Sequence, residues 1–183
     1  MPGAREFEQE ALVHLDSLYR GALRLTHNRA DAEDLVQETC VKALKAFHRY
    51  NPGTNCRAWL FTIMRNAFLN RIRNDKREVL EDEAALTGLA HAGTDAAGID
   101  SPEEEFFQTI LHGDVDRALK GLPLVYREAV MLADLEGFTY KEIAEILGCP
   151  AGTVMSRLSR GRQLLRHALH RFAREHGYTR GDE

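Results

Sequence analysis

The sequence predicts an all-α protein built from two small helical domains. In a chain of 183 residues, apolar residues recur at helical intervals of three and four in two separate blocks. No segment shows the apolar–polar alternation that is typical of a half-buried strand. A stretch rich in Ala, Gly and acidic residues separates the blocks and predicts a flexible linker. We therefore expect domains at 1–77 and 111–174, an acidic linker at 78–110 and a tail at 175–183.

The first domain is expected to contain three or four helices. Its first helix is predicted over residues 6–26 and is broken at His27-Asn28-Arg29. The next helix is predicted over 30–47, with Asn28 or Asp31 as its N-cap. The positions of this second helix that should face the core are Ala32, Leu35, Val36, Cys40, Ala43, Leu44 and Phe47.

A third helix with two unlike faces is predicted over 56–77, after a turn at 51–54. Its apolar face consists of Leu60, Met64, Ala67, Phe68 and Ile72. The opposite stripe carries hydroxyl, amide and cationic groups, from Thr62, Arg65, Asn66, Asn70, Arg73 and Arg77. Aromatic residues also lie among these cations, a combination that suits unstacked single strands. For Trp59 and Phe68, however, a place in the core is the simpler interpretation.

The second domain is predicted to contain a helix-turn-helix. Thr139 and Glu142 fit a capping box at the start of its first helix. Gly148 can adopt the positive φ that ends this helix, and Pro150 stands near the start of the next. The residues expected to face the core are Ile143, Leu147, Val154, Leu158 and Leu165. The outer face of the second helix suits a reader of the DNA major groove, although a helical hairpin with a solvated basic face is the alternative.

Charge is distributed along the chain in blocks, so the net charge of −4 does not exclude binding to DNA. Residues 56–77 carry six basic residues and one acid, and residues 151–174 carry six basic residues and no acid. Residues 78–114 hold ten acids and no Lys or Arg. Because affinity for DNA depends on local neutralisation of phosphates, both basic helices are candidate DNA contacts.

Nothing in the sequence indicates an enzyme, a metal site or a cofactor. Cys40, Cys56 and Cys149 form no C-x-x-C pair, and the histidines form no H-E-x-x-H array. The acidic clusters fall in the linker or on helix faces without His or Cys partners. No apolar run approaches the roughly 18 residues that span a bilayer, and the start of the chain lacks a signal-peptide pattern. We expect a cytoplasmic protein with no metal, no cofactor and no catalytic residue.

Three segments resemble the extracytoplasmic-function (ECF) sigma factors of bacterial RNA polymerase, a subfamily of the sigma-70 family. They are DAEDLVQETCVKALKAF at 31–47, CRAWLFTIMRNAFLNRIR at 56–73 and LEGFTYKEIAEILGCPAGTVMSRLSRGRQLL at 135–165. The resemblance implies that the first domain is sigma domain 2 and the second is sigma domain 4. It also implies that the protein directs the polymerase core to promoters, and that an anti-sigma factor holds both domains when the protein is inactive.

The resemblance further implies three sets of contact residues. The clamp coiled coil of the polymerase would bind Asp31, Asp34, Leu35, Gln37 and Glu38. The single-stranded −10 element would meet the turn over 47–55 together with Arg65, Asn66, Asn70, Arg73 and Arg77. The duplex −35 element would be read by Thr153, Ser156, Arg157, Ser159 and Arg160. The early helices of the second domain would bind the polymerase flap.

Two positions depart from the family pattern. Many members carry an arginine at the position of Met155, and an aromatic or basic residue at the position of Ser159. Met155 would therefore either touch a thymine methyl group or pack on the partner helix.

Two wider alternatives remain open at this point. A stand-alone helix-turn-helix regulator is the second interpretation of the sequence, and it predicts tight binding of the pure protein to duplex DNA. The acidic linker either enters the basic channel of the polymerase or acts as a solubilising tether.

Overall fold

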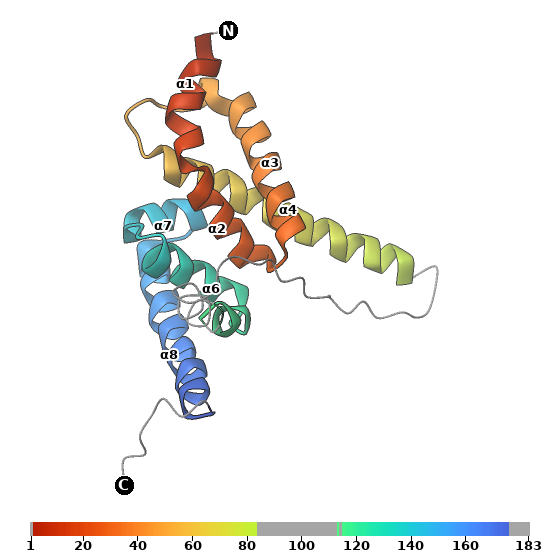
Figure 1. Cartoon of the computed structure of the whole chain (residues 1–183), viewed down its shortest axis with the longest axis vertical. Coiled ribbons are helices and arrows are strands. Elements are labelled where there is room, and N and C mark those ends of the chain that lie inside the picture. Colours follow the sequence, from red (N-terminus) through yellow and green to blue (C-terminus); the bar gives the residue numbers. More distant parts are fainter. Residues whose placement is uncertain (1, 84–112, 114, 176–183) are drawn as a thin grey trace, which may run out of the picture. The chain divides into compact units, whose positions relative to one another are not determined.

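The computed structural model describes residues 2–83, 113 and 115–175, and every element in these ranges is helical (Figure 1). The chain divides into two compact units, Met1–Ala97 and Gly98–Glu183, which are treated separately below. The all-α class and the two helical domains predicted from the sequence are therefore confirmed.

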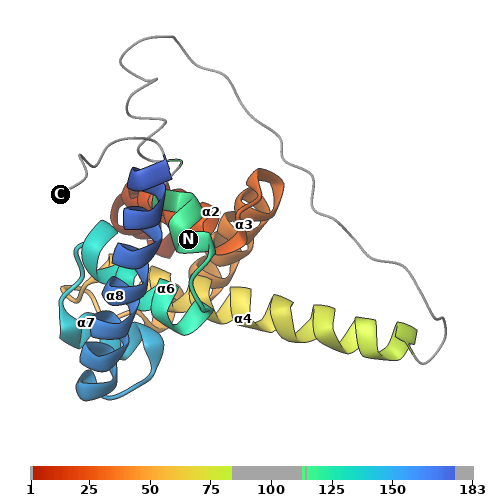
Figure 2. The ribbon, with the colours of Figure 1, turned by 90° about the horizontal axis from the view of Figure 1, so that it is seen from below.

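In its described residues, 2–83, the N-terminal unit contains four α-helices and two short 3₁₀ turns. In chain order they are α1 (Pro2–Ala11), η1 (Leu12–His14), α2 (Leu15–Thr26), α3 (Arg29–Ala46), η2 (Phe47–Arg49) and α4 (Cys56–Glu83). The single helix predicted over 6–26 is thus interrupted by η1. The helix predicted to end at residue 77 continues to Glu83, since 78–83 contain no Gly or Pro and several strong helix formers. The end of α4 extends beyond α2 and α3 (Figure 2).

The break between α2 and α3 is encoded by local polar contacts. His27 adopts a left-handed conformation at φ 54°, and its backbone N–H donates to the carbonyl of Leu23. The side chain of Asn28 accepts a hydrogen bond of 3.1 Å from the backbone N–H of Asp31. Asn28, not Asp31, is therefore the N-cap of α3, a contact that typically contributes about 1 kcal/mol.

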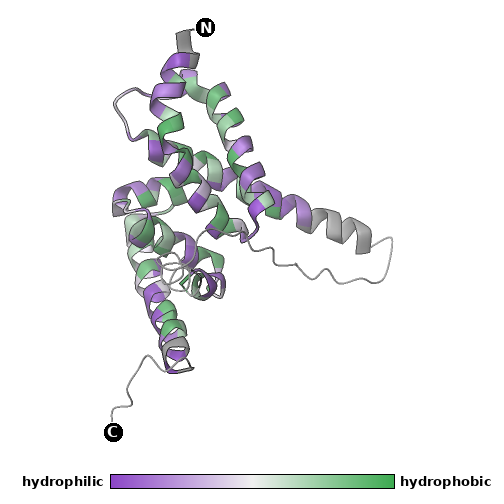
Figure 3. Cartoon of the chain, in the orientation of Figure 1, coloured by the Kyte–Doolittle hydropathy of each residue, from purple (hydrophilic) through white to green (hydrophobic). Residues whose placement is uncertain are grey.

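The core of the N-terminal unit lies between α2, α3 and α4. Leu18 and Leu35 are 0% exposed, and Phe61 is 1% exposed. Gly21 permits this packing, because a Cβ there would lie 2.9 Å from Cε1 of Phe61. Figure 3 shows apolar and polar residues mixed along each of these helices, as expected for helices with one buried face.

The buried face of α3 differs from the prediction at Leu44 and Thr39. Leu44 is 51% exposed, whereas the polar Thr39 is fully buried. The hydroxyl of Thr39 donates a hydrogen bond of 2.7 Å to the carbonyl of Leu35, so burial leaves no polar atom of the hydroxyl unsatisfied. The expectation that Leu44 faces the core is therefore wrong.

The C-terminal unit consists of α6 (Leu124–Val130), the π-helical turn η3 (Met131–Leu135), α7 (Tyr140–Leu147) and α8 (Ala151–Glu175), preceded by a helical segment at 115–120. The α6 and α8 helices approach closely at Gly161, where a Cβ would lie 2.7 Å from Cγ2 of Val130. The side chains of Ile143, Val154 and Leu158 are at most 1% exposed and join α7 and α8 in one core.

Candidate nucleic-acid interface

The helix-turn-helix is formed by α7, α8 and the turn between them. At the start of α7, Thr139 and Glu142 make both hydrogen bonds of the predicted capping box. Gly148 has φ 61° and ends α7, and the carbonyl of Pro150 accepts from the backbone N–H groups of Thr153 and Val154. The predicted motif is confirmed, and its turn fixes the direction in which α8 leaves α7.

The five residues predicted to read the −35 element all lie in the first three turns of α8 but differ in exposure. Ser156, Ser159 and Arg160 are exposed, whereas Thr153 and Arg157 are half-buried. Ser156 Oγ donates to the carbonyl of Thr153 at 3.0 Å, which leaves the hydroxyl oxygen available as an acceptor. Arg157 Nη1 lies 3.8 Å from Cys149 Sγ, so this side chain folds back toward the turn.

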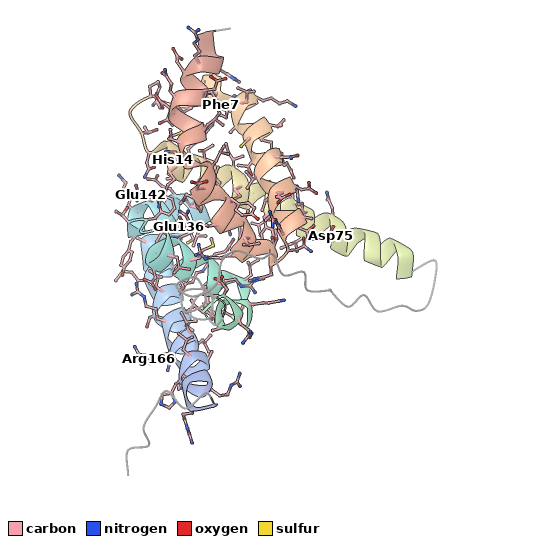
Figure 4. All side chains as sticks on the ribbon, viewed as in Figure 1. Phe7, His14, Asp75, Glu136, Glu142 and Arg166 are labelled. Atoms are coloured by element: carbon pink, nitrogen blue, oxygen red, sulfur yellow. The ribbon has the colours of Figure 1, made fainter. Side chains whose placement is uncertain are left out.

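A charged pair links η3 to α8. Arg162 Nε donates to Asp134 Oδ2 at 3.0 Å, and Arg162 Nη2 donates to Asp134 Oδ1 at 2.6 Å. The Asp134 carboxylate, and after it the Tyr140 phenol, raise the pKa of Arg162. This bidentate geometry holds the guanidinium in one orientation. Arg166, one turn further along α8, is exposed (Figure 4).

Sequence reasoning missed an open hollow of about 560 Å³ beside these residues. It is lined by Tyr140, Met155, Leu158, Ser159, Arg162, Gln163 and Arg166. Met155 is 57% exposed and Tyr140 is 43% exposed. Met155 is therefore mostly open to solvent, which favours a contact with DNA over packing on the partner helix.

The predicted polymerase-docking residues lie on α3, and one of them requires a correction. Asp31, Asp34 and Gln37 are exposed, but Leu35 is 0% exposed. Leu35 belongs to the core, because it lies on the face of α3 that packs on α2 and α4, so its predicted contact with polymerase is withdrawn. Glu38 is half-buried.

Glu38 joins α3 to α4 through Arg71 and also pairs with Lys42 on its own helix. Its Oε1 accepts from Lys42 Nζ at 2.6 Å, and its Oε2 accepts from Arg71 Nη2 at 2.8 Å. Lys42 and Arg71 hold the pKa of Glu38 below its usual range. The carboxylate is thus part of an ion-pair link between α3 and α4.

The amide and cationic stripe predicted on α4 forms one continuous face. Asn66, Asn70 and Arg73 are exposed and Arg65 is half-buried, while Arg77 belongs to α4 but its side chain lies outside the described residues. The aromatic residues take the other face: Phe68 is 9% exposed and, like Phe61, belongs to the core. The predicted stripe on α4 is therefore made of amides and cations, whereas Phe61 and Phe68 belong to the core.

The turn over 47–55 rests on an aromatic cluster. The ring of Phe47 stacks on Tyr50 at a centroid distance of 5.5 Å and meets Phe7 edge-on at 5.3 Å. The ring centroids of Trp59 and Tyr50 are 5.1 Å apart. The Tyr50 hydroxyl donates a hydrogen bond of 2.7 Å to the carbonyl of Thr54, which ties the exposed turn to the cluster. The aromatic residues Phe47, Tyr50 and Trp59 were the feature of the sequence from which this cluster could have been predicted.

Cysteine, histidine and acidic side chains also occur elsewhere in the described residues. The parts of the chain that the structure describes contain no group of three His, Cys, Asp or Glu side chains that could hold a metal ion. Burial raises the pKa of the Cys40 and Cys56 thiols, which makes both less reactive. None of the described helices is long and apolar enough to cross a bilayer.

Comparison with known protein families matches each of the two units to a family region. The family profile of Sigma-70 region 2 matches residues 12–78, and that of Sigma-70, region 4 matches residues 112–165. The ECF RNA polymerase sigma factor EcfG of Rhodopseudomonas palustris is 37% identical over 172 residues, which is 93% of this chain and 88% of that protein. The ECF RNA polymerase sigma factor SigE of Mycolicibacterium smegmatis is 39% identical over 88% of this chain, although the match spans only 61% of that longer protein.

A solved structure of similar fold supports the same assignment. The sigma factor RpoE of Bartonella quintana, crystallised with the anti-sigma factor NepR, is 35% identical and superposes with a TM-score of 0.73 over 91% of this chain and 98% of that one. CnrH, solved with the cytosolic domain of CnrY, is 26% identical and superposes with a TM-score of 0.61 over 91% of this chain and 88% of that one. The two matched regions, their order and the helix-turn-helix agree, and the chain belongs to the ECF sigma factors of RNA polymerase.

Proposed function

We propose that this sigma factor supplies the RNA polymerase core with two separate DNA readers and performs no chemistry itself. Residues 1–77 would dock on the polymerase and open the −10 element, and residues 111–174 would read the −35 element. The observation that carries this proposal is the exposed polar face of α8, which has no acidic residue between 151 and 174. A second exposed face of amides and cations lies on α4, in the other unit.

The −35 reader would be the start of α8. Ser156, Ser159 and Arg160 are exposed on the face that enters the major groove in helix-turn-helix proteins. Arg160 can pair with a guanine edge, and the serine hydroxyls can donate or accept. Thr153 and Arg157, which are half-buried, would contact the DNA backbone at the edges of this surface.

The −10 reader would combine the stripe on α4 with the turn over 47–55. Removing a base from the stack costs a few kcal/mol, which contacts elsewhere in the complex must offset. The stripe offers amides for base edges and arginines for phosphates, from Arg65, Asn66, Asn70, Arg73 and Arg77. The turn, anchored through Tyr50, offers a surface whose shape is fixed before DNA arrives.

The polymerase clamp would meet the acidic side of α3. Asp31, Asp34 and Gln37 are exposed there and Glu38 is partly exposed, which suits a basic helical partner. The flap would bind the early helices of the C-terminal unit. The linker at 78–110 would either follow the basic channel of the polymerase or act as a tether.

We also propose control by an anti-sigma factor that binds both domains in the cytoplasm. The sigma factor RpoE of Bartonella quintana has been solved with the anti-sigma factor NepR, and the similar CnrH has been solved with the cytosolic domain of CnrY. Exposed apolar side chains in this chain, such as Val41 and Leu44 on α3, offer contacts for a protein partner.

In vitro transcription with purified core enzyme tests the function. The full chain plus core is expected to produce transcripts from a specific subset of promoters on fragmented genomic DNA, whereas the chain alone binds duplex DNA weakly. Tight, sequence-specific binding by the chain alone, together with no promoter-specific transcripts in the presence of core, would favour a stand-alone regulator and overturn the proposal.

A further inference from the structure

The exposed face of α8 carries one large apolar side chain. Met155 is 57% exposed, whereas its apolar neighbours Val154 and Leu158 are 0% and 1% exposed. Single exposed apolar residues are common on protein surfaces, so exposure by itself assigns no role. Met155, however, directly precedes Ser156 and lies one turn before Ser159, within the part of a recognition helix that contacts base edges.

Met155 forms one wall of the hollow beside α8. Met155, Ser159 and Arg162 follow one another at helical spacing and line the hollow together, while Tyr140 of α7 lines it from the start of the neighbouring helix. The ring of Tyr140 is 43% exposed and adds a second apolar surface. A flat group that enters this hollow therefore meets apolar atoms from two helices.

The charges on this part of α8 favour DNA as the occupant. Arg166 lines the hollow as an exposed cation and Arg160 is exposed on the same helix, whereas the charge of Arg162 is balanced by its bidentate pair with Asp134. No acidic residue occurs between 151 and 174. Of the four bases, only thymine presents an apolar group, its C5 methyl, on the edge that faces the major groove. An apolar wall inside a basic surface thus matches a thymine.

We infer that Met155 determines specificity at the −35 element by contacting the C5 methyl group of a thymine. The ring of Tyr140 would lie on the other side of this methyl group. The inference rests on the proposed role of α8 as the reader of duplex −35 DNA. Removing one methyl group from water contributes a factor of about fourfold in affinity. Met155 would favour thymine by that factor over a base that lacks the methyl group.

The test replaces each thymine of the −35 element, one at a time on both strands, with deoxyuridine, which removes only the methyl group. Binding of holoenzyme to a promoter identified by transcript mapping is measured for the wild type and for Met155→Ala. At one position, uracil is expected to weaken wild-type binding about fourfold, and to change Met155→Ala binding by less than about 1.5-fold. Arg160→Ala is the matched control: it should weaken binding to every duplex but keep the fourfold effect of the methyl group.

The outcomes separate this inference from the proposed function. Met155 does not read a methyl group if uracil weakens the binding of wild type and of Met155→Ala by the same factor at every position. The same conclusion follows if no uracil weakens wild-type binding. A −35 element without thymine on either strand would overturn the inference equally. If instead holoenzyme shows no preference for the −35 element and Arg160→Ala binds as the wild type does, the assignment of α8 as the duplex reader itself fails.

Discussion

Replacing Gly161 by alanine should destabilise the C-terminal unit without affecting the N-terminal unit. A Cβ at this position would lie 2.7 Å from Cγ2 of Val130 and 3.1 Å from the backbone carbonyl oxygen of Tyr126. Val130 is 1% exposed and β-branched, so neither neighbour can easily move aside. Overpacking of this kind costs about 1–3 kcal/mol, whereas alanine gains about 1 kcal/mol in helix propensity over glycine. Because a contact below 3.0 Å essentially never occurs for a real Cβ, the overpacking cost should lie in the upper part of this range, at about 2–3 kcal/mol, so we expect a net loss of about 1–2 kcal/mol.

The single tryptophan of the chain makes the assay specific for each unit. Trp59 lies in the N-terminal unit, so its fluorescence during urea unfolding reports on that unit alone, while circular dichroism reports on the helices of both. With an m-value of about 1 kcal/mol per molar urea, Gly161→Ala should lower one dichroism midpoint by about 1 M or more and leave the fluorescence midpoint unchanged.

Gly152→Ala is the matched control on the same helix, because nothing lies within 4 Å of a Cβ at Gly152. This control should leave the fluorescence midpoint unchanged and should leave the dichroism midpoint unchanged or raise it, because alanine is the better helix former. A Gly161→Ala protein as stable as the wild type would refute the close approach of α6 and α8. A parallel shift of the Trp59 transition would refute the independence of the two units.

Three further substitutions test the other contacts. Thr139→Ala removes the capping box of α7 and should lower the unfolding free energy of the C-terminal unit by about 1 kcal/mol, seen as an earlier dichroism transition; an unchanged transition would contradict the cap. Tyr50→Phe removes the hydrogen bond to Thr54 and should slow promoter opening severalfold, as measured by permanganate reactivity. Holoenzyme binding to a −35 duplex should stay the same. Equal losses in both assays would argue against an anchored turn. Glu38 has a pKa below its ordinary value of 4.5, so its ion pairs should stabilise the N-terminal unit above that pH and be lost as the pH falls through the lowered value. Glu38→Gln should therefore flatten the acid dependence of the Trp59 transition, and an identical acid profile would show that the pairs contribute nothing.

Local signals in the sequence predicted the local structure well. The T-x-x-E pattern at Thr139, the glycine at Gly148 and the asparagine at Asn28 each act on neighbouring backbone groups, so their effect can be inferred without the fold. Helical periodicity likewise located α3 to within a residue or two, and Gly148 and Pro150 marked the turn before α8. The interruption at η1 has no comparable signal, because the apolar spacing continues through it.

Contacts between distant residues could not be predicted from the sequence. Arg71 and Glu38 are 33 positions apart, and Arg162 and Asp134 are 28 apart, so each pair forms only once the helices have packed. Periodicity also could not distinguish Leu44 from Thr39, because the orientation of α3 depends on where α2 and α4 meet it. The same packing explains why Leu35, predicted as a polymerase contact, lies in the core.

The most direct test of two separate DNA readers is a nucleotide-resolution map of strand opening at one promoter, made with wild-type, Arg160→Ala and Asn66→Ala/Asn70→Ala proteins, each bound to core polymerase. Wild-type holoenzyme should open the −10 region. Arg160→Ala, altered on α8, should bind the promoter weakly but open it once bound at high concentration. Asn66→Ala/Asn70→Ala, altered on α4, should bind the −35 element normally and fail to open the −10 region. Loss of binding and opening in equal measure for both variants would contradict the division of labour between α8 and α4.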